Sequence, residues 1–275
     1  MSLPISILVF DSDGVLSSGG QPFPHALEII AELNRTGYPY YILTNNPFLD
    51  SERKSLNYAR QGFSIPPERI IGAAHPLRNV LSQLPKKTGQ LYAVGCEDPK
   101  EYLKNLGFSI DLTSDDVDGI LLLDDDLRWD ADRVSRVLEL LIQRPDLPFI
   151  VPNPDMVYPD RPGHLYLTSG SWSRLLVMLC AEKGLNIQPI HLGKPFSPIY
   201  ASLQKILDQQ YPGLSKNQVL MLGDSPGTDV LGANQQGWLS ALIETGNHRF
   251  GRDRQDCQAT YVYQSLVEFW ADFKS

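Results

Sequence analysis

Short apolar runs alternate with stretches of helical periodicity along most of the chain. Ile5–Phe10 is apolar and rich in β-branched residues, which predicts a buried strand. His25–Thr36 has the pattern of a helix that ends at Gly37, and Tyr38–Leu43 is a second apolar run of strand length. This alternation of strands and helices is typical of an α/β fold with a parallel sheet.

Polar residues stand at the ends of three predicted strands. The first run leads into Asp11 and the second into Thr44, while a later run, Gln218–Leu222, leads into Asp224. A fourth strand is predicted at Ala241–Ile243. Because the carboxyl ends of parallel strands meet at one edge of a sheet, Asp11, Thr44 and Asp224 are predicted to be neighbours.

The middle of the chain has a rhythm of its own, which predicts a second α/β unit. We expect strands at Leu91–Val94, Gly119–Leu123 and Pro148–Val151, a helix with its apolar face at Val134, Val137, Leu138 and Leu141, and a helix at Trp172–Lys183 that ends at Gly184. The unit is predicted to span residues 75–187, inserted into a core formed by residues 1–74 and 188–275.

Composition narrows the class of protein. The 275 residues carry a net charge of -8 and no run of Lys and Arg, so nucleic acid is not an expected partner. No apolar stretch approaches the roughly 20 residues of a membrane helix, and the start lacks a signal-peptide pattern, so a cytoplasmic protein is predicted. The widely spaced cysteines suggest neither a disulfide framework nor a zinc cluster: Cys96, Cys180 and Cys257.

Two carboxylates follow the first strand, in Asp11-Ser12-Asp13-Gly14. Such a segment on its own can be an Asx-rich turn. With Asp224 at the same sheet edge, however, the anions would repel one another, and a hard divalent cation such as Mg²⁺ resolves that repulsion. The sequence therefore predicts a metal site here.

Three further signals are weak one by one. Thr44-Asn45-Asn46 can hold phosphate oxygens or can be a simple turn. Lys194, between Gly193 and Pro195, can place an ammonium beside a phosphate or can lie in solvent. Asp229 can act near the site or can cap a helix.

Histidine and serine chemistry is not indicated. The histidines share no ligand spacing that would predict zinc: His25, His75, His164, His191 and His248. Of these, only His191 could approach the pocket, because it lies near Lys194 in sequence. Ser171 and Ser225 lack a convincing base partner.

Together these motifs resemble the haloacid dehalogenase (HAD) superfamily of phosphotransferases. Its four motifs occur in order, as Asp11-x-Asp13, Thr44, Lys194, and Gly223-Asp224 with Asp229. Asn153-Pro154-Asp155 in the inserted unit also resembles the NagD-type, class IIA branch. The resemblance implies a Rossmann-like parallel-sheet core with an inserted α/β cap domain.

The chain departs from that branch in its cap. Thr168-Ser169-Gly170-Ser171-Trp172 stands where members often have a glycine-rich Pro-Gly segment, and the acidic run Asp124-Asp125-Asp126 is heavier than usual. Because the cap usually sets substrate choice, these departures leave the substrate open.

The resemblance implies a catalytic role for each motif. Asp11 would be the nucleophile and Asp13 the general acid and base. Thr44 and the backbone N–H of Asn45 would bind phosphate oxygens, and Lys194 would orient Asp11 and stabilise the transition state.

It implies a metal site as well. Mg²⁺ would be held by Asp11, by the backbone carbonyl of Asp13 and by Asp224, with Asp229 bracing Lys194 or a metal-bound water. In the cap, Asn153 and Asp155 are candidate substrate contacts. They can instead form a structural turn.

The predicted function is Mg²⁺-dependent hydrolysis of a small phosphorylated metabolite through an aspartyl-phosphate. A phosphotransferase or mutase and a phospho-aspartate switch module remain alternatives. A dehalogenase on the same fold fits less well, because it needs neither Asp13 nor Asp224. A homodimer is a possible assembly.

Overall fold

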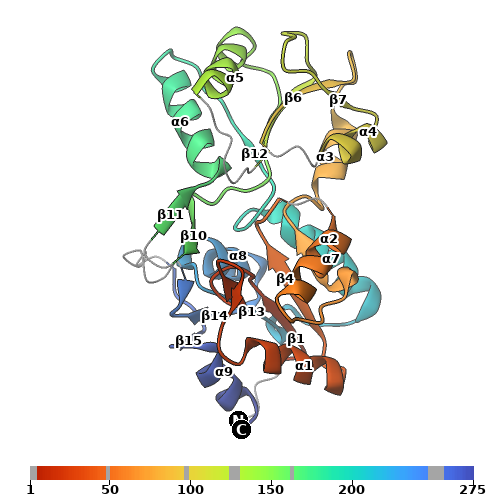
Figure 1. Cartoon of the computed structure of the whole chain (residues 1–275), viewed down its shortest axis with the longest axis vertical. Coiled ribbons are helices and arrows are strands. Elements are labelled where there is room, and N and C mark those ends of the chain that lie inside the picture. Colours follow the sequence, from red (N-terminus) through yellow and green to blue (C-terminus); the bar gives the residue numbers. More distant parts are fainter. Residues whose placement is uncertain (1–4, 48–49, 96–98, 124–130, 162–163, 247–256) are drawn as a thin grey trace.

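The computed structural model describes residues 5–47, 50–95, 99–123, 131–161, 164–246 and 257–275. Two parallel sheets, each with helices on both faces, form the molecule. In Figure 1 one sheet with its helices lies below and the other above. The predicted α/β class with a parallel-sheet core is thereby confirmed.

The lower sheet has six strands in the order β15-β14-β13-β1-β4-β5, and all neighbours are parallel. Its strands are β1 (Ile7–Phe10), β4 (Tyr40–Thr44), β5 (Ile70–Gly72), β13 (Val219–Gly223), β14 (Leu239–Ile243) and β15 (Tyr261–Tyr263). β1 lies between β4 and β13, with Phe10 opposite Ile42 and Leu222. The chain therefore leaves three adjacent strands at one edge, where the predicted site residues follow.

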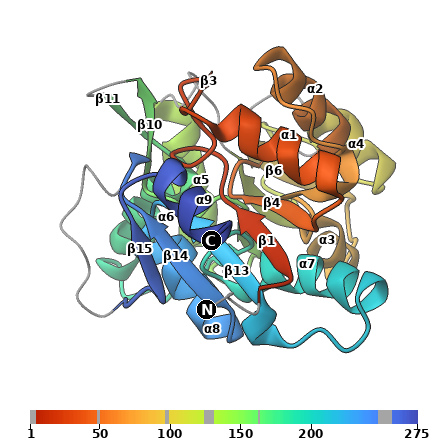
Figure 2. The same cartoon turned by 90° about the horizontal axis from the view of Figure 1, so that it is seen from below.

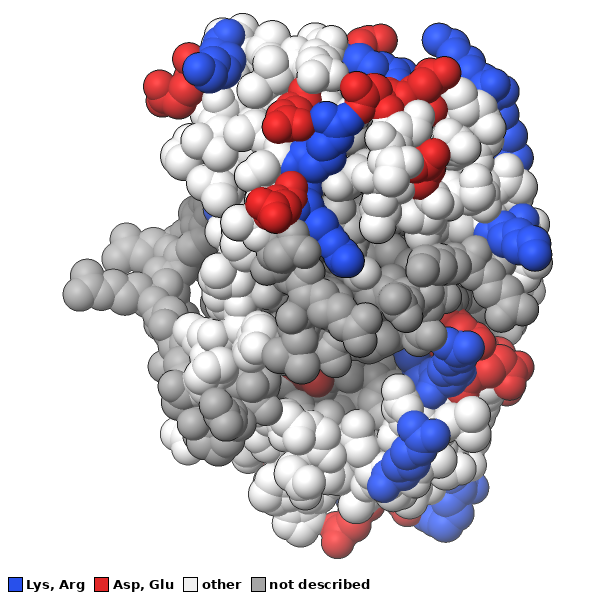
Figure 3. Space-filling model, turned by 45° about the horizontal axis from the view of Figure 1, so that its top comes forward, with Lys and Arg blue, Asp and Glu red and all other residues white. Residues whose placement is uncertain are grey.

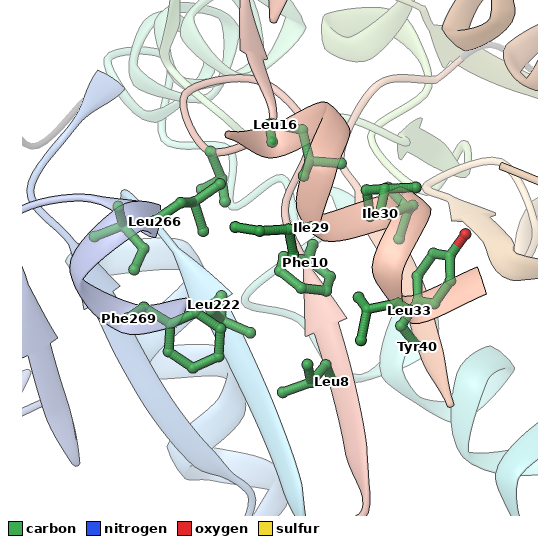
Figure 4. Close-up of a cluster of buried hydrophobic side chains, with 14 of the residues drawn as sticks. Leu8, Phe10, Leu16, Ile29, Ile30, Leu33, Tyr40, Leu222, Leu266 and Phe269 are labelled. Carbon is green, nitrogen blue, oxygen red and sulfur yellow. The ribbon is translucent and has the colours of Figure 1, made fainter. Parts of the chain in front are cut away.

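Helices cover both faces of this sheet, as the view from below in Figure 2 shows. Its helices are α1 (Ala26–Thr36), α2 (Ser51–Arg60), α7 (Ser197–Gln210), α8 (Leu231–Gln236) and α9 (Leu266–Phe273). Leu8 and Phe10 point toward α1 and α9, where they pack with Ile29 and Phe269 (Figure 4). Ile7 and Val9 belong to the cluster on the other face, which contains residues of α7 and α8. Alternate burial on two faces accounts for the continuous apolar sequence of β1.

The upper sheet has the order β12-β9-β8-β6-β7 and is parallel as well. Its strands are β6 (Gln90–Val94), β7 (Ser109–Ile110), β8 (Gly119–Leu122), β9 (Phe149–Val151) and β12 (Ile190–His191), and its helices are α3 (Leu77–Gln83), α4 (Pro99–Asn105), α5 (Ala131–Gln143) and α6 (Ser169–Ala181). Residues of α5 and α6 pack in one apolar cluster with the sheet, and residues of α3 and α4 in another. The strand β12 belongs to the upper sheet but lies beyond residue 187, the predicted end of the inserted unit. The boundaries of that unit stay a prediction.

Two hairpins lie between the sheets. One is β2 (Ser17–Ser18) with β3 (Gln21–Pro22), directly after the Asp11 loop, and the other is β10 (Val157–Arg161) with β11 (His164–Leu167). The strands β2 and β10 contact each other, so the loop that follows β1 touches the upper unit.

Some elements differ from their predicted bounds. The first helix ends at Gly37, as predicted, because Gly37 adopts a left-handed conformation with φ 68°. The predicted Trp172–Lys183 helix begins earlier, at Ser169, after Thr168 at its N-cap. On α5, Leu140 is buried and Leu138 only partly so, which shifts the apolar face slightly from the predicted one.

The described surface mixes both signs of charge. Figure 3 shows Lys and Arg interspersed with Asp and Glu over the part that carries the upper sheet. Among the described helices, none has the length and apolar character needed to cross a bilayer. The acidic run Asp124–Asp126, Cys96 and His248 lie outside the described residues.

Candidate active site

Asp11 stands at the point where β1 leaves the sheet. Its backbone N–H still bonds the carbonyl of Leu222 on β13, at 2.8 Å. The next backbone N–H, that of Ser12, donates to Asp11 Oδ1 at 2.7 Å. The strand therefore fixes the position of Asp11, and the first residue of the loop fixes the orientation of its carboxylate.

Lys194 lies between two of the predicted acids. Its Nζ is 2.7 Å from Asp11 Oδ1 and 2.6 Å from Asp229 Oδ1, and its side chain is 2% exposed. Burial by itself lowers the pKa of Lys194, but the Asp11 and Asp229 carboxylates outweigh burial and the net shift is upward. The lysine is thus a charged group at neutral pH, held against the proposed nucleophile.

A third carboxylate, that of Asp224, lies close to these two. Ligand oxygens of Asp11, Asp224 and Asp229 all lie within 4.8 Å of one another. Burial, followed by the charge of Asp229, raises the pKa of Asp11 well above its usual value, although Lys194 acts in the other direction. One ammonium does not neutralise three acids, and a hard divalent cation with oxygen ligands fits the remaining charge. The carboxylate of Asp13 is not in this group, and its predicted contribution is a backbone carbonyl.

Glycines make room for the buried acids. A Cβ on Gly14 would lie 2.1 Å from Asp224 Oδ2, and one on Gly246 would lie 2.0 Å from the same atom. Gly14 has φ +93°, so a side chain there would also strain the backbone. Thr245 Oγ1 donates to the carbonyl of Gly14 at 2.6 Å and ties the two glycine loops together.

The predicted phosphate-binding residues follow β4. Thr44 is buried, and its Oγ1 accepts a hydrogen bond from the N–H of Asn46 at 3.2 Å. The Asn45 side chain holds the backbone of Lys194: Oδ1 accepts from Lys194 N at 2.6 Å, and Nδ2 donates to Lys194 O at 2.9 Å. Since the side chain of Asn45 is engaged with protein, its predicted bond to phosphate concerns the backbone N–H.

Asn153 and Asp155, predicted in the cap, lie against this same region. Asn45 Nδ2 donates to Asp155 Oδ1 at 2.9 Å, and Asn153 Oδ1 accepts from the N–H of Asp155 at 2.9 Å. These bonds fit the structural turn that the sequence left open, while direct contact of either residue with substrate stays a prediction. Asp155 therefore joins the upper unit to the loop after β4.

The segment that departs from the NagD-type pattern holds this turn in place. Ser169 Oγ donates to the carbonyl of Asn153 at 2.9 Å, and Thr168 Oγ1 bonds the carbonyl of Asp155. A Cβ on Gly170 would lie 2.2 Å from the Asp155 carbonyl oxygen. The hydroxyls and the glycine at the start of α6 thus fit the backbone of the turn closely.

Asp13 faces a cavity of about 100 Å³, which Thr44 and the α2 residues Lys54 and Tyr58 also line. Burial raises the pKa of the Asp13 carboxyl, although Lys54 and Lys194 lower it in part. A raised pKa suits a group that must donate a proton.

Sequence reasoning missed Lys54 and Tyr58. They are the buried residues of α2, whose remaining residues are polar or exposed. A hydrophobic pattern could not reveal a buried lysine, and the one available signal was the spacing i, i+4 of Lys54 and Tyr58, which places them on one helix face.

His191 lies close to the site along the chain but is packed differently. Its ring stacks on Phe196 with centroids 4.5 Å apart. Burial, followed by the charge of Arg174, lowers the pKa of His191 to about 4. Within the described residues, the acidic cluster contains no histidine.

The fold and this acidic cluster define an α/β protein with an acidic site at the carboxyl edge of a parallel sheet. Comparison with known families agrees. A family model described as haloacid dehalogenase-like hydrolase matches residues 8–109, and one described as HAD-hydrolase-like matches residues 191–269. The chain belongs to the HAD superfamily.

Individual relatives cover nearly the whole chain. A dihydroxyacetone phosphatase from Corynebacterium glutamicum is 26% identical, over 99% of this chain and 94% of its own. A structure titled as a possible sugar phosphatase from Cytophaga hutchinsonii has a TM-score of 0.81 and 26% identity, over 96% of this chain and 95% of its own. NagD from Escherichia coli K-12 has a TM-score of 0.73 and 22% identity, over 96% and 98%, and shows the same fold. The resemblance to NagD-type proteins is thereby confirmed.

Proposed function

We propose that this protein is a Mg²⁺-dependent phosphomonoester hydrolase that acts on a small phosphorylated metabolite through an aspartyl-phosphate on Asp11. The observation that carries the proposal is the contact of Lys194 Nζ with Asp11 Oδ1, at 2.7 Å within a cluster of three acids. Relatives whose names describe phosphatases of small metabolites support it.

In the first step, a carboxylate oxygen of Asp11 attacks phosphorus, and the bond from phosphorus to the ester oxygen breaks. Asp13 gives its proton to the departing oxygen, so that an alcohol leaves. In the second step, Asp13 takes a proton from water as that water attacks phosphorus. The bond between Asp11 and phosphorus breaks, which releases inorganic phosphate and restores both side chains.

The remaining residues bind and orient the reacting groups. Lys194 and Thr44 hold phosphoryl oxygens, while Asp229 keeps the Lys194 ammonium in place through its 2.6 Å contact. Asp11, Asp224 and the Asp13 carbonyl are the groups that would hold Mg²⁺, which when bound supplies positive charge between the anionic nucleophile and the anionic phosphate.

The test is phosphate release from a panel of phosphorylated metabolites, with Mg²⁺ and with EDTA. We expect turnover that requires Mg²⁺ and that falls by at least about 10³-fold in Asp11→Asn, which removes the nucleophile. Asp146→Asn, at an exposed position outside the site, is the matched control and should retain the wild-type rate. Near-native turnover in Asp11→Asn would end the proposed mechanism.

A second readout tests the metal site without relying on activity. Mg²⁺ should raise the melting temperature of the wild-type protein, because a ligand that binds only the folded state stabilises it. In Asp224→Asn the shift should be lost. Stable phosphorylation without release would instead identify a switch module, and transfer to an added alcohol would identify a phosphotransferase.

A further inference from the structure

A small cavity lies beside the proposed phosphate site, on the side of Asp13. It measures about 100 Å³, and each residue that lines it has a polar group on its side chain. Asp11, Lys194 and Asp224 are not among its lining residues, whereas Asp13 and Thr44 are. The cavity therefore adjoins the phosphate site rather than containing the metal-binding acids.

Its position relates it to the leaving group. A general acid must lie within hydrogen-bond reach of the oxygen that it protonates. If Asp13 protonates the departing oxygen, as in the proposed function, the group bonded to that oxygen must occupy the space that Asp13 faces. Thr44, which is proposed to hold a phosphoryl oxygen, borders the same space.

Lys54 brings an ammonium into this cavity from α2. The residue is 6% exposed, and its Nζ donates to the carbonyl of Asn46 at 2.7 Å. An ammonium has three donors, and within the described part of the chain no other hydrogen bond or ion pair of Lys54 is found. Gly72 makes space for it, since a Cβ there would lie 2.4 Å from Lys54 Nζ.

This arrangement is unusual for a buried charge. Buried ammonium groups are normally paired with a carboxylate, because removal from water is costly. Burial lowers the pKa of Lys54 to about 7, and the more distant charge of Asp13 offsets only part of that effect. A bound anion would supply the missing partner.

A second residue that borders the cavity has a polar atom without a hydrogen-bond partner. Gln61 Oε1 is covered by protein, yet it has no hydrogen bond within the described residues. Gln61 borders the same cavity as Lys54. A ligand hydroxyl group would satisfy this acceptor if the Gln61 side chain turned toward the cavity.

The size of the cavity limits the ligand. Sites for drug-sized ligands measure roughly 300–1,000 Å³. A space of about 100 Å³ takes only a few non-hydrogen atoms, so a two- or three-carbon group fills it, and a nucleoside or an aromatic ring would extend out of it.

We propose that Lys54 is a specificity-determining residue, which binds a carboxylate on a small hydroxylated leaving group next to Asp13. The preferred substrates are then phosphomonoesters of short hydroxy acids. This inference rests on the proposed function, and it adds a substrate class that the catalytic motifs do not specify.

A matched pair of substrates tests the proposal. 3-Phosphoglycerate and glycerol 3-phosphate share one carbon skeleton and differ in a carboxylate against a CH₂OH group. We expect the wild-type kcat/KM to favour 3-phosphoglycerate by about tenfold or more, the effect of one hydrogen bond to a charged group. In Lys54→Met, which keeps the unbranched shape and most of the length of the side chain without the charge, this ratio should fall at least tenfold.

Two further variants serve as controls, one for the loss of any lysine charge and one for misfolding of Lys54→Met. Lys205→Met makes the same chemical change at an exposed position of α7 and should keep the wild-type ratio. Lys54→Gln retains a donor for the Asn46 carbonyl and should lose the ratio as Lys54→Met does, which keeps the test valid if the Met variant fails to fold. In the wild-type protein, glycerate should inhibit at a lower concentration than glycerol.

The outcomes separate the two proposals. A wild-type ratio near one, or an unchanged ratio in the folded Lys54 variants, overturns the role of Lys54 while p-nitrophenyl phosphate is still hydrolysed. Release of phosphate from none of the three esters and from no member of the wider metabolite panel, in the presence of Mg²⁺, overturns the proposed function itself.

Discussion

At the scale of single residues, the site depends on glycines as much as on charged side chains. Gly223 ends β13, and a Cβ on it would lie 2.1 Å from the Cβ of Asp229. The absence of that atom lets Asp229 approach the strand end and reach Lys194. The glycine of the fourth motif is therefore required by packing.

Replacing this glycine should damage the site. In Gly223→Ala the added methyl group displaces Asp229, so its 2.6 Å contact with Lys194 lengthens or breaks. We expect kcat for the best substrate to fall roughly 10- to 100-fold, with a smaller loss of melting temperature. The control is Gly119→Ala in β8, where a Cβ would lie no closer than 3.3 Å to its neighbours. Wild-type turnover in Gly223→Ala would show that Asp229 does not position Lys194.

At the scale of elements, strand ends and helix starts supply the groups of the proposed site. Lys194 comes between β12 of the upper sheet and α7 of the lower unit. The nearby ring stack of His191 on Phe196 packs the chain that carries the lysine. The protonation state of His191 thus affects the packing of the segment between β12 and α7, which carries Lys194.

The low pKa of His191 predicts a specific pH dependence of stability. Because its folded pKa, about 4, is below the unfolded value of 6.5, the unfolded chain binds the proton more readily between these values. His191 therefore reduces stability progressively as pH falls from 6.5 toward 4 and has no such effect above 6.5. Glutamine does not titrate in this range. From pH 7.5 to pH 4.5 the melting temperature of His191→Gln should therefore fall less than that of the wild-type protein. An equal fall in both proteins would contradict this prediction.

At the scale of the whole molecule, one side chain connects both sheets to Lys194, the proposed catalytic lysine. Asn45 bonds both backbone polar groups of Lys194 and the carboxylate of Asp155 in the turn after β9. The serine and threonine at the start of α6 hold that turn. The segment that departs from the NagD-type pattern is thus connected to the proposed catalytic site through Asn45.

A double-mutant cycle measures this connection. Asn45→Ala leaves the buried N–H of Lys194 without its acceptor and should destabilise the protein by about 1–3 kcal/mol. Asp155→Ala should have a smaller effect, and the double variant should show a coupling of roughly 0.5–3 kcal/mol. The exposed pair Gln204 and Asp208, 2.7 Å apart on α7, is the control and should couple by less than about 0.5 kcal/mol. Additive effects at Asn45 and Asp155, measured by chemical denaturation, would rule out a stabilising link.

The class of fold and the order of the motifs follow from local sequence. Apolar runs of strand length that end in Asp11, Thr44 and Asp224 identify a parallel sheet with a polar edge, because each run is buried on both faces. The short elements β5 and β15 carry too few residues for a clear pattern.

The sequence alone determined that a strand delivers each acid to the carboxyl edge of the sheet, since that information lies in neighbouring residues. Only the tertiary structure decided that Lys54 is buried beside Asp13, that Asn45 bonds both Lys194 and Asp155, and that Gly246 lies against Asp224. These relations join segments far apart in the chain. No local pattern of polar and apolar residues specifies them, because a buried lysine and an exposed one look the same in sequence.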